Sequence, residues 1–127
     1  MLVVDDSAYV QRRIVQILES SPDLKVAGVA RDGFEALERL DAVDPDVITM
    51  DINMPRCNGL EATRLIKAEM PQIKIIILTV SDDDEDLFEA IKSGASGYLL
   101  KNIKAEEFFS LLSGVARGEI AIPSLLA

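Results

Sequence analysis

Four residues that suit a buried strand, Val47-Ile48-Thr49-Met50, stand directly before Asp51. A second run of this kind, Ile75-Ile76-Ile77-Leu78, stands directly before Thr79. Apolar residues on successive positions, rather than on alternate ones, are typical of parallel strands that helices cover on both faces. The two runs therefore predict the central strands of a parallel sheet.

On either side of these runs, strand and helix patterns alternate along the chain. Segments with apolar residues at helical spacing follow each of five short apolar runs. The predicted strands are Leu2 to Val4, Lys25 to Val29, Val47 to Met50, Ile73 to Leu78, and Tyr98 to Leu100. Residues that end helices, three prolines and one glycine, follow the first four helical segments: Pro22, Pro45, Pro71 and Gly94. The order is strand then helix five times, which predicts a doubly wound α/β fold.

Length and composition narrow the class of protein. The 127 residues suit one domain, and with 49% hydrophobic and 28% charged residues the chain does not have the composition of a disordered protein. The net charge of -9 argues against direct binding to nucleic acid or to an anionic membrane. We see no membrane span or signal peptide, and the single Cys57 cannot form an intrachain disulfide. We therefore expect a cytoplasmic protein.

The chain contains no histidine. This excludes imidazole catalysts, histidine metal ligands and a phosphohistidine carried by the chain itself. Its chemistry must come from carboxylates, hydroxyls, amines and the one thiol.

Polar side chains follow four of the five predicted strands at the point where each strand ends. They are Asp5 and Asp6, Asp51, Thr79, and Lys101. Any one of them alone is more often a turn former or a helix cap. Because the carboxyl ends of parallel strands form one edge, where ligands bind in open α/β sheets, we expect these side chains to converge.

Such a cluster favours particular chemistry. Carboxylates held close together raise one another's pKa values unless a cation lies among them, and Mg²⁺ prefers the oxygen ligands that they offer. An aspartate can attack phosphorus and form an acyl phosphate, while Mg²⁺ and a lysine ammonium offset the charge of the transferred group. The cluster therefore predicts a phosphoryl acceptor that lacks its own donor.

Five separated motifs resemble those of the receiver domain of two-component response regulators. They are Asp5-Asp6-Ser7, Asp51-Ile52-Asn53-Met54-Pro55, Asn58-Gly59, Thr79, and Gly97-Tyr98-Leu99-Leu100-Lys101. The resemblance covers essentially the whole chain, and its motifs occur in the family's order. It implies the flavodoxin-like receiver fold, a five-stranded parallel sheet with strand order 2-1-3-4-5.

The resemblance also implies which residues carry the phosphoryl group and the metal. Asp51 would be the phosphoacceptor. Asp5 and Asp6 would hold Mg²⁺ together with Asp51 and the backbone carbonyl of Asn53. The domain would not be an enzyme in the usual sense, although it would catalyse its own Mg²⁺-dependent phosphorylation and slow dephosphorylation.

Three further residues receive roles in the same way. Lys101 would pair with the phosphate, and Thr79 and Tyr98 would form a switch pair that conveys phosphorylation to the surface. The donor would be the phosphohistidine of a sensor histidine kinase, and a homodimer could form on phosphorylation.

The segment from Gly97 to Glu119 resembles the NarL/LuxR subgroup, in which a helix-turn-helix DNA-binding domain comes next. The chain stops at Ala127, so we expect residues 1–127 to be the receiver domain alone, without that output domain. The implied function is a phosphorylation-dependent switch in transcription regulation.

Three other functions remain open at this point. A stand-alone chemotaxis-type regulator, which acts by protein contacts, would end in nearly the same place. A haloacid-dehalogenase-type phosphatase needs a second aspartate two residues after its nucleophile, but position 53 is Asn, which cannot transfer a proton. A flavin site needs a phosphate-binding loop after the first strand, where the chain has Asp6-Ser7-Ala8. We therefore favour the signalling switch.

Overall fold

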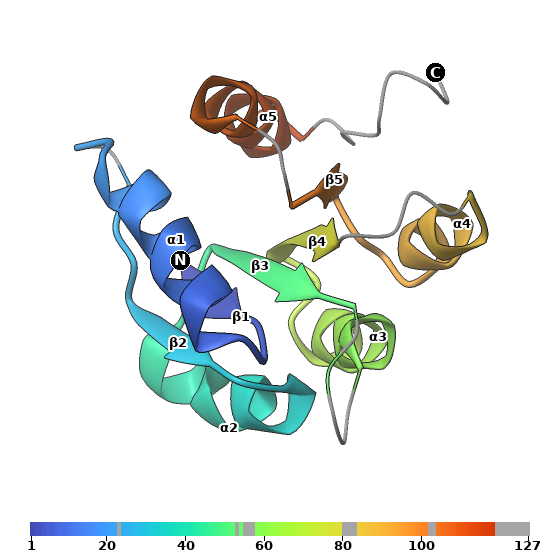
Figure 1. Cartoon of the computed structure of the whole chain (residues 1–127). Coiled ribbons are helices and arrows are strands. Elements are labelled where there is room, and N and C mark those ends of the chain that lie inside the picture. The colour runs from blue at the N-terminus through green and yellow to red at the C-terminus, as the bar shows by residue number, and fades with distance from the viewer. Residues whose placement is uncertain (23, 53, 55–57, 80–83, 102–103, 119–127) are drawn as a thin grey trace.

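The computed structural model describes residues 1–22, 24–52, 54, 58–79, 84–101 and 104–118. Strands and helices alternate in it as predicted (Figure 1). The strands are β1 (Leu2–Val4), β2 (Gly28–Ala30), β3 (Val47–Asp51), β4 (Lys74–Thr79) and β5 (Gly97–Leu100). The helices are α1 (Ala8–Glu19), α2 (Gly33–Val43), α3 (Gly59–Glu69), α4 (Asp84–Lys92) and α5 (Ala105–Ala116). The strands form one parallel sheet in the order β2-β1-β3-β4-β5, which confirms the predicted topology.

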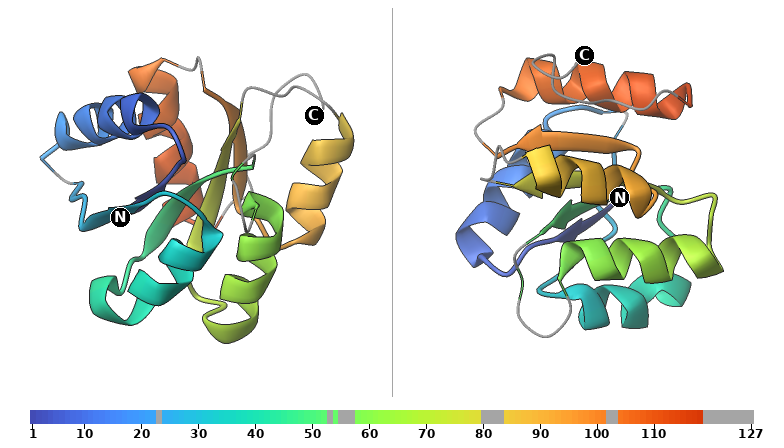
Figure 2. Two further views of the ribbon diagram at one scale, coloured as in Figure 1. Left: turned by 60° about the horizontal axis from the view of Figure 1, so that its bottom comes forward. Right: turned by 90° about the vertical axis from the view of Figure 1, so that its right-hand side faces the viewer.

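Helices cover both faces of the sheet (Figure 2). One core cluster joins α1 and α5 to one face, through Leu18, Ile76 and Phe108 among others. The other cluster joins α2, α3 and α4 to the opposite face, with Ile66 and Ile77 among its members. Because both faces are buried, the central strands are apolar on successive residues, as their sequences indicate. In the part of the chain that the structure describes, no helix is both long and apolar enough to cross a membrane.

The second strand is shorter than predicted, and it is shifted along the chain. The apolar pattern predicts Lys25 to Val29, whereas β2 begins at Gly28 and ends at Ala30. In the described part of the chain, β2 pairs with β1 alone, and the first residue of β1, Leu2, lies opposite Gly28. Before Gly28 the chain still bonds to Met1, since the Ala27 N–H donates to the Met1 carbonyl at 2.8 Å and the Met1 ammonium donates to the Lys25 carbonyl at 2.6 Å, but the ladder with β1 begins at Gly28.

Side-chain caps begin the three helices that follow β1, β2 and β3. Ser7, Asp32 and Asn58 accept hydrogen bonds from the backbone N–H groups of Val10, Glu35 and Glu61, respectively. Each cap satisfies a backbone donor that the first turn of a helix leaves without a partner. The caps therefore fix how the chain turns from strand to helix at the carboxyl edge of the sheet.

One buried hydroxyl in the central strand has no hydrogen-bond partner among the described residues. Thr49 is 1% exposed, and its Oγ1 atom makes no hydrogen bond there. Thr49 lies between Val3 of β1 and Ile76 of β4, both of which are fully buried and apolar. A buried hydroxyl without a partner costs free energy relative to a methyl group of the same shape.

Thr49→Val should therefore stabilise the protein. Replacing the unpaired hydroxyl by a methyl group removes its desolvation cost, so we expect the free energy of unfolding to rise by about 1 kcal/mol in urea titrations. Thr63→Val is the matched control, because the buried Thr63 hydroxyl donates a 2.7 Å hydrogen bond to the Gly59 carbonyl. The control should lose about 1 kcal/mol. Equal losses in both variants would contradict this account of Thr49.

Candidate functional site

A lysine ammonium lies between two buried carboxylates at the carboxyl edge of the sheet. Lys101 Nζ is 2.8 Å from Asp5 Oδ2 and 3.1 Å from Asp51 Oδ1. Asp5 follows β1, Asp51 ends β3, and Lys101 follows β5. Strand order makes β1 and β3 neighbours, and the long lysine side chain reaches them from beyond β4. The structure therefore brings together three of the residues that the sequence predicts to converge.

Asp6 completes the acidic part of this cluster. Carboxylate oxygens of Asp5, Asp6 and Asp51 lie within 4.8 Å of one another. Asp5 and Asp51 are 1% and 4% exposed, whereas Asp6 is exposed to solvent. The cluster is therefore accessible to solvent at Asp6, whereas Asp5 and Asp51 are buried in the protein.

The donor set fits a hard divalent cation. Asp5 Oδ2 is buried, and apart from its ion pair with Lys101 it has no hydrogen-bond partner among the described residues. Among the described residues, three carboxylates face a single ammonium, so negative charge is in excess there. Oxygen ligands and excess negative charge are what Mg²⁺ requires. The carbonyl of Asn53, the fourth predicted ligand, lies outside the described residues.

The pKa of Asp51 reflects first its burial and then the negative charge around it. Burial, followed by the negative charge of Asp5, raises the pKa of the Asp51 carboxyl from 3.8 to about 6, although Lys101 opposes the change. For Lys101, burial lowers the pKa, but the hydrogen bond with Asp5 and the charge of Asp51 raise it further, so it lies above its ordinary value. The lysine is therefore charged at neutral pH. Its charge does not bring the pKa of Asp51 back to the ordinary value of an aspartate.

The predicted switch residues lie beside this cluster rather than in it. Thr79 ends β4 and is fully buried, one residue beyond Leu78, which pairs with Asp51. Its backbone carbonyl accepts a 2.8 Å hydrogen bond from the Lys101 N–H. Tyr98 is 2% exposed and belongs to the core cluster on the α2, α3 and α4 face. The tyrosine ring is therefore already inside the core in the conformation that the structure describes.

Gly59, at the start of α3, packs against the backbone of Asp51. Its N–H donates a 2.9 Å hydrogen bond to the Ile52 carbonyl, which brings the start of α3 against the end of β3. A Cβ atom at position 59 would overlap the backbone carbonyl of Asp51 and would come within 3.0 Å of the Ile52 Cα. Only glycine lets the helix approach the strand this closely.

Comparison with known proteins identifies the family. The sequence model of the response regulator receiver domain matches residues 1–113. The chain belongs to this family. The resemblance that its five motifs predict is thereby confirmed.

The relatives of the chain include transcriptional regulatory and response regulator proteins. The chain is 38% identical over 125 residues to the uncharacterized transcriptional regulatory protein YxjL of Bacillus subtilis, covering 98% of this chain and 57% of that protein. It is 34% identical over 126 residues to the nitrate/nitrite response regulator protein NarL of Escherichia coli, covering 99% and 58%, respectively. The chain thus spans less than two thirds of either relative.

A solved structure agrees with the receiver fold. The crystal structure of a LuxR-family two-component response regulator from an Aurantimonas species has a TM-score of 0.89 and 29% sequence identity. The match covers 94% of this chain and 86% of that one. The NarL/LuxR resemblance predicted from residues 97–119 is confirmed by these relatives.

Gly59→Ala should damage the receiver domain through the backbone of Asp51. The added methyl group has to displace the β3 carbonyl, so we expect a loss of about 3 kcal/mol in the free energy of unfolding. Gly97→Ala is the matched control, because a Cβ atom there meets its nearest neighbours at 3.4 Å, an ordinary contact. We expect the control to lose less than about 1 kcal/mol. Similar losses for both variants would show that α3 does not press on Asp51.

The raised pKa of Asp51 predicts a pH-dependent effect of Asp51→Asn in Mg²⁺-free buffer. In wild type the folded state holds the Asp51 proton up to about pH 6, whereas the unfolded state releases it near 3.8. The folded state therefore loses stability as pH rises from about 4 to about 6, and the penalty persists above that window. Asparagine carries no such charge, so Asp51→Asn should be more stable than wild type by up to about 3 kcal/mol at pH 8, and about equal at pH 4.

Urea titrations at the two pH values measure this difference. Asp41→Asn, on an exposed part of α2, is the control, and it should change stability by less than about 0.5 kcal/mol at either pH. A constant difference between wild type and Asp51→Asn at both pH values would show that Asp51 titrates as an ordinary aspartate.

Proposed function

We propose that this receiver domain is a phosphorylation-dependent switch in which Asp51 accepts the phosphoryl group. The observation that carries the proposal is the crowding of Asp51 with Asp5, Asp6 and Lys101, whose charged atoms meet at one edge of the sheet. Asp51 is the member of this group that lies at the end of the central strand β3, and burial, followed by the charge of Asp5, raises its pKa.

The proposed reaction uses each charged residue differently. An Asp51 carboxylate oxygen forms a bond to phosphorus as the bond from phosphorus to the donor's leaving group breaks, which gives an acyl phosphate. Lys101, already 3.1 Å from Asp51 Oδ1, would pair with an oxygen of the transferred group. Asp5 and Asp6 would hold Mg²⁺ together with Asp51 and the Asn53 carbonyl. When bound, Mg²⁺ offsets the negative charge that the incoming phosphoryl group adds.

We infer that the donor is a sensor histidine kinase. Response regulators are partners of such kinases, and this chain has no histidine that could carry a phosphoryl group itself. Beyond its own Mg²⁺-dependent phosphorylation and slow dephosphorylation, we assign the domain no enzymatic turnover.

We infer that the output is transcription regulation through an attached DNA-binding domain. Both relatives described above are named as regulators, and the chain covers 57% and 58% of them. Residues 1–127 would constitute the receiver domain, in the cytoplasm, where phosphorylation could also promote a homodimer. With a net charge of -9, the domain itself has little attraction for the phosphates of DNA.

The route from Asp51 to the surface would pass through Thr79 and Tyr98. Thr79 ends the strand next to Asp51, and Tyr98 lies opposite Ile77, two residues before Thr79. A phosphoryl oxygen that accepts a hydrogen bond from the Thr79 hydroxyl would favour one position of β4 and repack Tyr98 within its cluster. The surface that responds would be formed by α4, β5 and α5.

Phosphorylation of Asp51 is the direct test of the proposed function. Intact-mass spectrometry after incubation with acetyl phosphate should show one added phosphoryl group in wild type with Mg²⁺, and none in EDTA. Asp51→Asn should show none under either condition, because its amide is not a nucleophile, whereas Asp41→Asn should match wild type. Uptake by Asp51→Asn, or equal uptake in EDTA, would contradict the assignment.

Thr79→Ala should uncouple the surface from Asp51 while leaving phosphorylation intact. We expect beryllium fluoride, a mimic of the phosphoryl group, to shift amide NMR signals of α4, β5 and α5 in wild type, and to shift them several-fold less in Thr79→Ala. Thr79→Ser keeps the hydroxyl and should behave as wild type. If Thr79→Ala responds as strongly as wild type, the signal leaves the site by another route.

A further inference from the structure

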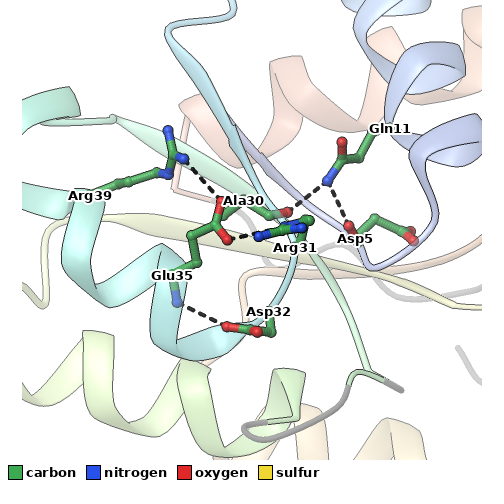
Figure 3. Close-up of polar contacts among 7 residues, drawn as sticks. All are labelled: Asp5, Gln11, Ala30, Arg31, Asp32, Glu35 and Arg39. Atoms are coloured by element: carbon green, nitrogen blue, oxygen red, sulfur yellow. Dashed lines mark hydrogen bonds and ion pairs between the residues drawn. The ribbon is translucent and has the colours of Figure 1, made fainter.

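One neutral side chain outside the acidic cluster holds the turn that carries its first two members. The Gln11 amide of α1 donates a 2.7 Å hydrogen bond to the Asp5 backbone carbonyl and a 2.9 Å hydrogen bond to the Ala30 carbonyl (Figure 3). Both acceptors are main-chain atoms at the ends of neighbouring strands, β1 and β2. Gln11 therefore uses both amide hydrogens on the backbone beneath the cluster.

The same residue also holds the far side of the turn. Its backbone N–H donates a 2.9 Å hydrogen bond to the Ser7 carbonyl, the first helical hydrogen bond of α1, which does not depend on the side chain. Within the turn, the Ser7 N–H donates to Asp5 Oδ1 at 2.9 Å, which sets the orientation of the Asp5 carboxylate. Asp5 and Ser7 are thus both fixed to Gln11, and Asp6 lies between them.

Ala30 makes this arrangement rigid with respect to the sheet. Its carbonyl accepts from the Asp5 N–H at 3.0 Å as well as from the Gln11 amide. The end of β1, the end of β2 and the first turn of α1 therefore meet at one carbonyl group. Displacement of the Asp5 backbone would break two hydrogen bonds to Ala30 and Gln11 at once.

Asp6 depends on this support more than Asp5 does. The Asp5 carboxylate is held by Lys101 and by the Ser7 N–H. The exposed Asp6 carboxylate has no hydrogen bond or ion pair in the described part of the chain, so its place in the cluster is set by its backbone.

We propose that Gln11 is a positioning residue for divalent cation binding, acting through the backbone of the Asp5-Asp6-Ser7 turn. The inference rests on the proposed function, in which Asp5 and Asp6 hold Mg²⁺. Groups that orient metal ligands without touching the metal commonly change metal affinity by 10- to 100-fold when they are removed. Because Gln11 acts on the backbone of the ligands, we expect the lower end of that range.

The experiment is a titration of ¹⁵N-labelled protein with MgCl₂, followed by amide NMR shifts of the turn. Gln11→Met keeps the length of the side chain and removes both donors. Gln16→Met makes the same substitution at an exposed position of the same helix. Ile66→Val removes a methylene group from the core on the other side of the sheet, and so serves as a destabilised control with an intact turn.

We expect the Kd for Mg²⁺ to rise on the order of 10-fold in Gln11→Met, and to stay within about 2-fold of wild type in both controls. All titrations are run at a temperature at which melting curves show each protein fully folded. A residue that only stabilises the fold would lower the melting temperature without changing the Kd of the folded molecules. Gln11→Ala, which places no new group against the two carbonyls, serves if Gln11→Met does not fold.

The outcomes separate this inference from the function on which it rests. If the folded Gln11 variants bind Mg²⁺ with the same Kd as wild type, the positioning role is wrong, but the proposed function is not affected. A wild-type protein that binds no Mg²⁺ would overturn both. If the Kd for Mg²⁺ rose as much in Gln16→Met or Ile66→Val as in Gln11→Met, the inference would also be overturned, because the effect would then not be specific to the turn.

Discussion

The excess of carboxylates over cations around Asp51, counted over the described residues, is the constraint on which the rest of the site depends. One ammonium, that of Lys101, serves both Asp5 and Asp51, and a third carboxylate lies within 4.8 Å of theirs. Two of the three carboxylates are almost completely buried, so water solvates them only poorly. The site therefore carries excess negative charge. A bound divalent cation would neutralise part of this charge, and an added phosphoryl group would increase it.

The fold maintains this unfavourable arrangement partly by holding the backbones of the acidic residues. Gly59 lets α3 press against the carbonyl of Asp51, and Gln11 fixes the carbonyl of Asp5 to that of Ala30. Both contacts act on main-chain atoms at the ends of strands. The repulsion between carboxylates is consequently opposed by the sheet and its helices together, and not by a single contact at the site.

Much of this could be predicted from the sequence, because the information is local. Apolar runs on successive residues indicate strands buried on both faces, and the polar residue at the end of four of the five runs marks the carboxyl edge. Asp5, Asp51 and Lys101 meet as these rules predict. The start of β2 could not be predicted in this way, since the composition of residues 25–29 does not show which of them join the ladder with Leu2 to Val4. Gln11 was missed because a glutamine on a helix shows no pattern, and its partners, Asp5 and Ala30, are main-chain carbonyls far apart in sequence.

The central claim is that Asp51 belongs to a cluster that lacks positive charge, and ¹³C NMR titration of the Asp51 side-chain carboxyl tests it most directly. Without Mg²⁺ the pKa should be about 6, raised by burial and by Asp5. With saturating Mg²⁺ it should fall below the ordinary value of 3.8, because the bound cation favours the carboxylate form. A pKa near 4 that Mg²⁺ does not change would contradict the account.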